Sequence, residues 1–566
     1  MGSMKDADVI VIGSGAGGLA SALCLARAGK KVIVLEQHYV PGGWSHSFYV
    51  DGFRFSPGIH YIGAMGVGQD ASRVYEGLGV ANHLTFFQQN EKAYDHGRIG
   101  NKRFDFPAGK TRLIESLRSQ FPHEHKAIKK YVDLVDLARR ELQHIQEVDT
   151  VWEHITIPYH TRHMGKYALF SLQRVINWHL KDPLLKAFLN IQCGNHGLSP
   201  ERSSFILHAA MMGHYLDGGF YPAGGGGAIV KAFTKEIKKY KGEIITSARV
   251  EKILTSRNAK GVKAHGVRLA DGRELYSDLI VSNADPDKTY LGMVEEDHLD
   301  GKIKKRLSKT TYSVASLNMF LIVKKDLREL GMDSGNIWYG EHQDLNAIYR
   351  QLHTQNPTEG DVFPGMFLGS PTLKDPVSQD GIHHTIEAIT FVPYQFFKKF
   401  EGSESGNRPD AYNRLKEVLA KKMLNTVEKL LPGIKDAVVK WELGTPLTNS
   451  YYTEGTEGNC YGTEKVMKQL GPFAYNAKTS IEGLYMTGSS TLSHGVMGAT
   501  NSGINTAARI LGVKKPNQLL KVDPNQFVKI ISAEHEDTWP EWVLNKQQQR
   551  ARRAESKIIS TVEKGQ

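Results

Sequence analysis

The chain has 566 residues, of which 40% are hydrophobic and 23% charged, and its formal net charge is +11. A chain of this length exceeds one simple core, so two or three structural units of an ordinary globular protein are expected. Its longest apolar runs fall short of the roughly 20 residues of a membrane-spanning helix, and its three distant cysteines argue against a disulfide scaffold or a cysteine-rich metal site.

The positive charge is spread over stretches such as "KEIKKYK" rather than gathered in one block. This pattern is typical of solvated helix faces; a basic face that meets anionic lipid headgroups is the alternative. No nucleic-acid-binding motif accompanies the charge, so nucleic acid is not an expected partner. The first ten residues lack the apolar segment of a signal peptide, and the few cysteines suit a reducing compartment. We therefore expect a cytoplasmic protein, with peripheral membrane contact as the open alternative.

The first predicted elements form a strand–turn–helix–strand unit. Residues 9–12 are an apolar run, and Gly13, Gly15 and Gly18 follow in G-x-G-x-x-G spacing. A helix of small residues then leads to a second apolar strand, which ends at Glu36. In a dinucleotide site the three glycines make the tight turn, admit the pyrophosphate and let helix and strand pack closely, in that order. The helix N-terminus faces the phosphates and the acid accepts hydrogen bonds from a ribose.

A glycine pair follows the acid directly in "PGGWSHSF" (41–48), an arrangement that resembles the large class of FAD-containing oxidoreductases. Near the other chain end, "IEGLYMTGSS" (481–490) predicts a strand, and residues 494–511 predict a glycine-rich entry into a helix. Both ends are built for close backbone approach, so we expect them to share one FAD site. The residues expected at the FAD are Gly13, Gly15, Ala16, Gly18, Glu36, Gln37, Gly42, Gly43, Trp44, Ser45, Val250, Gly488, Ser489, Val496 and Met497.

The middle of the chain alternates between two kinds of pattern. Residues 112–200 have helical periodicity, and residues 221–286 predict a glycine-rich turn, a helix, a strand and a hairpin at Asp271-Gly272. Residues 287–440 mix strand-like runs with an amphipathic helix near 411–430. We expect an α/β fold in which a Rossmann-like FAD-binding domain, of the glutathione reductase or amine oxidase type, is discontinuous and carries an inserted α+β substrate domain.

The domain boundaries follow from these patterns. The FAD-binding domain is expected to comprise residues 4–66, 221–286 and 441–512, and the substrate-binding domain residues 67–220 and 287–440. Residues 513–566 form a C-terminal extension that ends in a basic helix, which is solvated or, alternatively, anchored at a membrane surface.

Five segments resemble their counterparts in the retinol saturases, which belong to the phytoene desaturase and carotenoid isomerase group of flavoproteins. They are "EQHYVPGGWSHSF", "DGFRFSPGIHYIG", "GHYLDGGFYPAGG", "TPLTNSYY" and "LYMTGSS". The resemblance runs from about residue 6 to about residue 511. It implies FAD and a long, apolar, isoprenoid-like polyene substrate.

The resemblance favours an enzyme that reduces a carbon–carbon double bond, in which the flavin carries the chemistry and the protein supplies orientation and a proton. A polyene desaturase and a flavin-dependent cis–trans isomerase are the alternatives within the group. An amine oxidase is a further alternative, because Cys460 is placed similarly to the flavin-linked cysteine of monoamine oxidases. A non-enzymatic carrier of prenyl lipids is the alternative outside enzymes. The electron donor is not identified: no second nucleotide fingerprint is evident, and direct use of NAD(P)H is not expected.

The segment "FSPGIHYIGAMG" (55–66) places His60 and Tyr61 between glycines in an apolar setting, where we expect the flavin–substrate boundary. Saturating an alkene needs a proton donor there. The candidates are Tyr61, Tyr221, His60, His214 and His494. Tyr61 and Tyr221 rank first because a phenol tolerates an apolar tunnel better than an imidazolium does. About half of a further set is expected to line that tunnel: Met65, Met211, Met212, Tyr215, Phe220 and Tyr221. No metal site is expected.

Overall fold

A computed structural model describes residues 5–147, 161–259 and 261–564. Its first sheet is parallel and has five strands, in the order β19, β13, β1, β2, β9. The bounds are Leu484–Met486, Ile280–Ser282, Val9–Ile12, Val32–Leu35 and Glu243–Ile245. Strands β1 and β2 are buried along their whole length, as uninterrupted apolar runs in a parallel sheet should be.

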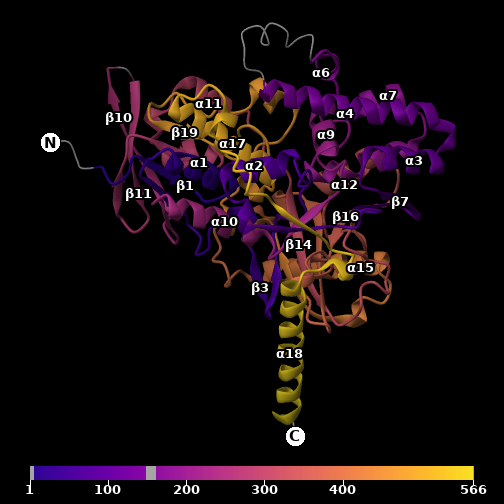
Figure 1. Cartoon of the computed structure of the whole chain (residues 1–566). Helices are drawn as coiled ribbons and strands as arrows, with labels where there is room; N and C mark the ends of the chain where they lie inside the picture. The colour runs from indigo at the N-terminus through magenta and orange to yellow at the C-terminus, as the bar shows by residue number, and fades with distance from the viewer. Residues whose placement is uncertain (1–4, 148–160, 260, 565–566) are drawn as a thin grey trace.

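This parallel sheet is covered on both faces. One face packs against α1 (Ala16–Arg27), α10 (Gly226–Lys239) and α17 (Gly495–Leu511). The other face packs against a three-stranded sheet of β10 (Val250–Asn258), β11 (Gly261–Leu269) and β12 (Glu274–Tyr276). Helices α1 and α17 touch closely, because a Cβ on Gly503 would lie 2.2 Å from the carbonyl oxygen of Gly17. The strands and the two glycine motifs therefore meet at one place (Figure 1).

The second large sheet has seven strands in the order β18, β14, β17, β16, β15, β6, β7. Their bounds are Val438–Gly444, Ala315–Val323, His384–Val392, Gly365–Gly369, Asn336–Gly340, Asp95–Ile99 and Lys102–Phe106. Helices on this side of the molecule share its core (Figure 1). They are α3 (Lys110–Gln120), α4 (His125–Glu147), α6 (Arg162–Tyr167), α7 (Leu172–His179), α8 (Pro183–Asn190), α9 (Phe205–His214), α12 (Leu345–Thr354), α14 (Gln395–Lys398) and α15 (Asp410–Leu430).

Smaller elements join the two parts. Strands β20 (Lys529–Ser532), β5 (Thr85–Gln88) and β8 (Phe220–Pro222) form a three-stranded sheet, so part of the C-terminal extension is paired with the body. Helix α18 (Glu541–Lys564) then projects from the body (Figure 1). The remaining elements are β3 (Phe48–Val50), β4 (Phe53–Phe55), α2 (Asp70–Leu78), α11 (Gly301–Leu307), α13 (Pro371–Lys374) and α16 (Pro446–Thr453).

The predicted elements agree with the structure where it describes them. The first strand, the hairpin at Asp271-Gly272, the long amphipathic helix and the basic C-terminal helix are all present. The helical prediction for 112–200 holds for α3, α4, α6, α7 and α8, while residues 148–160 lie outside the described residues. No helix among the described residues is both long and apolar enough to span a membrane.

Candidate functional site

A single cavity of about 1300 Å³ lies between the two large sheets and is lined by residues from both. That volume exceeds the roughly 300–1,000 Å³ of a typical small-molecule site, so it can hold two molecules. One end, the nucleotide end, is lined by the glycine motifs and Glu36. The other end, the apolar chamber, is lined by side chains of the seven-stranded sheet, α9 and α12.

All the residues expected at the FAD line the cavity except Gly18. Gly18 lies behind the turn, where a Cβ would come within 2.0 Å of the carbonyl oxygen of Gly13. Gly18 therefore allows close packing behind the turn, as the motif predicts, and its inclusion among the residues expected to contact the FAD is corrected. Gly17, which the sequence analysis did not single out, lines the cavity instead: a Cβ there would lie 2.8 Å from Gly488 Cα. The two glycine motifs thus touch backbone to backbone.

The nucleotide end fits a dinucleotide. Gly13 adopts a φ of +87°, which favours glycine, and a Cβ on Gly43 would lie 3.3 Å from Gly15 Cα, so side chains are absent where a phosphate must approach. The buried Glu36 carboxylate follows β2 and accepts hydrogen bonds from the Ser14 and His38 backbone N–H groups, each at 2.9 Å. Its position at the end of the second parallel strand is the one that binds a ribose in such sites.

Two polar atoms in the cavity wall are suited to hydrogen-bond a bound group. The Asn283 Oδ1 and His494 Nδ1 atoms are buried and have no hydrogen-bond partner among the described residues. Buried polar atoms are paired in native proteins as a rule. Both residues lie beside the C-terminal glycine motif, since a Cβ on Gly488 would come within 2.5 Å of Asn283 Oδ1 and His494 precedes α17. The residues present therefore fit a polar, flavin-like group.

The apolar chamber is made of uncharged side chains. Its lining includes Ile191, Ile206, Leu207, Met211, Tyr215, Trp338, Leu345, Ile348, Tyr349, Leu352, Met366, Phe367, Ile389 and Phe391. Of the side chains expected to line a tunnel, Met211 and Tyr215 do so. Met65, Met212, Phe220 and Tyr221 are buried in the protein core instead, outside the cavity lining.

His60 lies in the cavity wall and is held by a buried carboxylate. Its Nδ1 atom is 2.7 Å from Oε2 of Glu387, on β17 of the seven-stranded sheet. The same carboxylate accepts a hydrogen bond from the Ser56 backbone N–H at 2.8 Å. Glu387 therefore fixes the orientation of the imidazole ring and holds the proton on Nδ1. The His60 carbonyl oxygen accepts a hydrogen bond from the buried Lys374 Nζ at 2.9 Å.

Tyr61 lines the same cavity and is held by a second buried carboxylate. Its hydroxyl donates to Asp95 Oδ2 and accepts from Asn195 Nδ2, both at 3.1 Å, while its ring stacks on Tyr215 at 4.2 Å between centroids. Burial, together with the Asp95 carboxylate, raises the pKa of Tyr61 well above its usual range. The phenol therefore keeps its proton at neutral pH.

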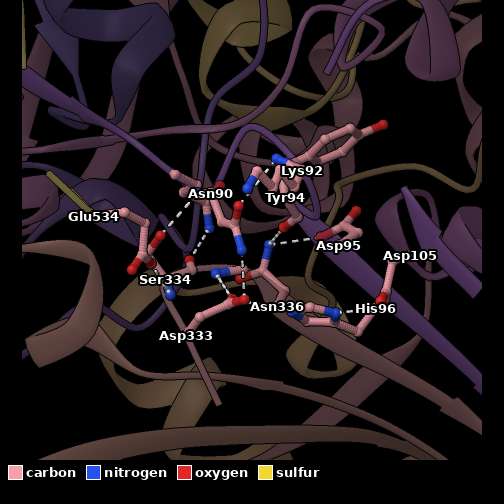
Figure 2. A network of polar contacts seen from close by, with 12 residues as sticks. Asn90, Lys92, Tyr94, Asp95, His96, Asp105, Asp333, Ser334, Asn336 and Glu534 are labelled. Carbon is pink, nitrogen blue, oxygen red and sulfur yellow. Dashed lines mark hydrogen bonds and ion pairs between the residues drawn. The ribbon is translucent and has the colours of Figure 1, made fainter. Parts of the chain in front are cut away.

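Asp95 belongs to a larger polar network on β6 and β15. Its Oδ1 accepts a hydrogen bond from Asn336 Nδ2 at 2.7 Å. Close to Asn336 in the chain, the Ser334 N–H donates to Glu534 of the C-terminal extension, so the network reaches that extension (Figure 2). Gln192 Nε2 donates to Oδ2 at 2.6 Å. Despite these donors, burial raises the pKa of Asp95 to about 6. Asp95 can therefore change its protonation state near neutral pH. Nothing in the local sequence pattern marked Asp95 or Glu387.

The other candidate proton donors are less suited. Tyr221 lies outside the cavity lining, with its hydroxyl 3.4 Å from Ser56 Oγ, which removes the reason for ranking it first. His214 and His494 line the cavity, but burial lowers the pKa of His214 to about 4 and that of His494 to about 3. The Nε2 atom of His214 accepts from the Gly63 N–H, and that of His494 donates to the Asn195 carbonyl, each at 3.0 Å. Both rings are therefore neutral, and each stabilises the neighbouring backbone through its hydrogen bond.

Known proteins resemble this chain over most of its length. All-trans-retinol 13,14-reductase of Rattus norvegicus is 29% identical over 529 residues, which are 89% of this chain and 85% of that protein. Prolycopene isomerase 1, chloroplastic, of an Oncidium hybrid cultivar is 28% identical over 546 residues, which are 91% of this chain and 86% of that protein. The structure of a putrescine oxidase triple mutant has a TM-score of 0.58 at 16% identity and covers 89% of this chain and 99% of that one.

A family described as flavin containing amine oxidoreductase matches residues 16–379 and 406–511. This match includes the Glu36 strand, most strands of both large sheets and the C-terminal glycine motif. The predictions of an amine oxidase-type α/β fold, of FAD as the cofactor and of an oxidoreductase are confirmed. The chain belongs to the flavin containing amine oxidoreductase family.

Proposed function

We propose that this protein is a FAD-dependent reductase that saturates a carbon–carbon double bond in an apolar, isoprenoid-like polyene, in the manner of a retinol 13,14-reductase. One observation carries the proposal: a single cavity joins the nucleotide end to an uncharged chamber, with His60 and Tyr61 in its wall. The similarity to the rat reductase, over most of both chains, supports it.

At the nucleotide end, the FAD pyrophosphate is assigned to the backbone around Gly13, Gly15 and Ala16, and the adenosine ribose to Glu36. The flavin end is assigned to the backbone of Gly488 and Ser489 and to Val496 and Met497, at the start of α17. When bound and reduced, FAD supplies the hydride for one carbon of the double bond. The protein must supply the rest: a dry chamber, an orientation and a proton for the neighbouring carbon.

Tyr61 is assigned the role of proton donor. Its hydroxyl proton points to Asp95 when that carboxylate is ionised. Once Asp95 is protonated, Asp95 can donate to the phenol oxygen, and the phenol proton is then free to turn toward the cavity. The pKa of about 6 for Asp95 makes this state accessible near neutral pH. Asp95 thus resupplies the proton that Tyr61 delivers.

An amine oxidase and a flavin-free lipid carrier fit the cavity less well. An amine that is charged at neutral pH is best held by a carboxylate, and the side chains named above for the apolar chamber include aromatic rings but no carboxylate. A covalent flavin link at Cys460 is also disfavoured, because burial raises the pKa of its thiol to about 12 and the thiolate is the reactive form. A carrier would have no use for the glycine cradle or for Glu36.

A flavin-dependent cis–trans isomerase is the second candidate. The observation that favours it is the prolycopene isomerase relative, which covers as much of this chain as the rat reductase does. The same apolar chamber would hold either substrate. The two functions differ in hydrogen balance, because an isomer has the mass of its substrate and a reduction product is heavier by two hydrogens.

The deciding experiment incubates the FAD-loaded protein anaerobically with all-trans-retinol or prolycopene, with the flavin either oxidised or chemically reduced. A reductase gives a product heavier by two hydrogens, only with reduced flavin and in an amount equal to the flavin oxidised. An isomerase gives products of unchanged mass and leaves the flavin state unaltered over many turnovers. Absence of both products would refute the proposal.

Peripheral membrane contact at the cavity mouth is part of this proposal. Leu169 lines the cavity and is 79% exposed, and Trp178 nearby is 53% exposed and packs on Phe170. Lys166 and Arg174 lie over the rings of Tyr167 and Phe170. An exposed apolar rim with cations is the chemistry that an anionic lipid surface recognises.

Flotation with anionic lipid vesicles tests this contact. A Leu169→Asp, Trp178→Ala double variant should lose vesicle binding, whereas Val522→Asp, at another apolar residue that is 64% exposed, should retain it. Loss of binding only in an Arg552→Glu, Arg553→Glu variant would assign the contact to helix α18 instead.

A further inference from the structure

Behind the wall of the apolar chamber lies a buried cluster of one thiol and two imidazoles. Cys193 lies in a short 3₁₀ segment (Ile191–Asn195), His196 follows it directly, and His208 comes from α9. All three side chains are fully buried. The cluster plays no part in the assigned reaction, and its residues are absent from the cavity lining.

The geometry of the cluster suits one ion. One candidate ligand atom from each residue lies within 4.8 Å of the others. The Cys193 Sγ to His208 Nδ1 distance is 3.7 Å, and the His196 Nε2 to His208 Nδ1 distance is 3.5 Å. Zinc at about 2.0–2.1 Å from nitrogen and about 2.3 Å from sulfur places tetrahedral ligand atoms about 3.3–3.6 Å apart. The observed distances are therefore close to those of a bound site.

The hydrogen bond that holds His208 also suits a metal. The His208 Nε2 atom donates to the Leu189 carbonyl oxygen at 3.0 Å, which leaves the lone pair on Nδ1, the atom that faces the cluster. Metal-binding histidines are held in this way by a carbonyl or carboxylate on the other ring nitrogen.

Hydrogen bonds alone leave the cluster unsatisfied. The single lone pair on His208 Nδ1 has two neighbours, the Cys193 thiol and His196 Nε2, and cannot fully accept from both. A metal ion would instead use the thiolate and both facing nitrogen lone pairs at once. A further polar atom, Ser203 Oγ, lies 3.4 Å from His196 Nε2.

We propose that Cys193, His196 and His208 bind one zinc ion, which has a structural role. Binding releases the thiol proton to solvent and involves no redox step. The ion would fix the segment that carries Asn195, whose amide donates to the Tyr61 hydroxyl. The same segment offers the Gly194 carbonyl to the Tyr461 hydroxyl and the Asn195 carbonyl to His494. The metal would therefore hold the chamber wall in place beside the proposed proton donor.

The test is metal content, measured by mass spectrometry on FAD-loaded protein purified without chelators or nickel resin. Wild-type protein, after incubation with Zn²⁺ and dialysis into metal-free buffer, should hold about one zinc per chain. Cys193→Ala and His208→Gln should each lower zinc content at least tenfold. Cys24→Ala, a change at another buried cysteine, should retain it. Flavin occupancy and melting temperature show whether each variant is folded.

The wild-type measurement needs no variant to fold. Zinc below about a tenth of an equivalent in wild-type protein after this treatment would overturn the proposal. Stoichiometric zinc in folded Cys193→Ala and His208→Gln proteins would overturn it as well. Equal loss in the Cys24→Ala protein would show that zinc follows general stability, and would also count against these ligands.

Discussion

The two ends of the cavity are built by different means. The nucleotide end is made of backbone: glycines from two motifs meet so closely that a Cβ on Gly17 would lie 2.8 Å from Gly488. The apolar chamber is made of side chains from β15, β16, β17, α9 and α12. A site made of backbone has positions at which only glycine fits, whereas an apolar wall accepts many side chains of similar size. Substitutions at the two ends should therefore impair the protein in different ways.

The largest effect is expected at the nucleotide end. Gly15→Val places a branched side chain where a Cβ already comes within 2.7 Å of Asn283 Nδ2, beside the expected pyrophosphate. We expect loss of bound FAD and of all activity, measured as the ratio of flavin absorbance to protein absorbance. Gly301→Ala, at a helix start where a Cβ meets nothing within 4 Å, is the control and should keep full occupancy. A folded Gly15→Val protein with full flavin would contradict the assignment.

The second effect separates two buried tyrosines. Tyr61→Phe removes the hydroxyl in the cavity wall and should slow substrate-driven flavin reoxidation by ~100-fold, with flavin reduction unchanged. Tyr221→Phe removes a hydroxyl outside the cavity lining and should change the rate by less than about twofold. Stopped-flow absorbance measures both steps. If His60→Gln slowed reoxidation while Tyr61→Phe did not, the proton donor would be His60, held by Glu387, and not Tyr61.

The third effect concerns pH. Because burial raises the pKa of Asp95 to about 6, the protonated carboxyl that resupplies Tyr61 is present below that pH and is lost as the pH rises through it. Reoxidation should be fastest below pH ~6 and fall by up to about tenfold per unit above it. Asp95→Asn cannot ionise, so its profile should lose this decline. An unchanged decline in that variant would exclude Asp95 as its source.

The smallest effect compares two adjacent methionines on α9. Met211 lines the chamber, so Met211→Ala should raise the KM for a polyene by about tenfold and leave stability nearly unchanged. Met212 is 3% exposed in the core, so Met212→Ala should lower the free energy of unfolding by about 2–5 kcal/mol with little change in KM. Steady-state kinetics measures the KM, and denaturant unfolding measures the free energy of unfolding. The reverse pattern would show that Met212, and not Met211, lines the chamber.

The sequence predicted the two ends of the cavity unequally, for a physical reason. Gly13, Gly15 and Glu36 could be placed because a tight turn, a close approach and a strand-end acid are local requirements. The partners of the His60-Tyr61 pair could not, because Asp95 is 34 residues from Tyr61 and Glu387 is 327 residues from His60. The two carboxylates lie on strands β6 and β17 of the seven-stranded sheet, and only the tertiary fold brings them to the pair.

The same reason explains the errors. Tyr221 follows a glycine-rich segment as Tyr61 does, yet pairing of β8 with β5 directs it away from the cavity. Met211 and Met212 are adjacent and identical in type, so the sequence does not distinguish them. Because of the orientation of α9, Met211 lines the chamber and Met212 lies in the core. Gly18 was assigned from a motif whose third glycine packs rather than binds, which the structure confirms through its contact with Gly13.

The most direct test of the central claim, that one cavity brings FAD and an apolar polyene together for reduction, is a single-turnover measurement. Wild-type protein with chemically reduced FAD is mixed anaerobically with all-trans-retinol, and flavin absorbance and product are followed together. The account predicts that the flavin is reoxidised with one dihydro product formed per flavin. Flavin that stays reduced, with no dihydro product, would contradict it.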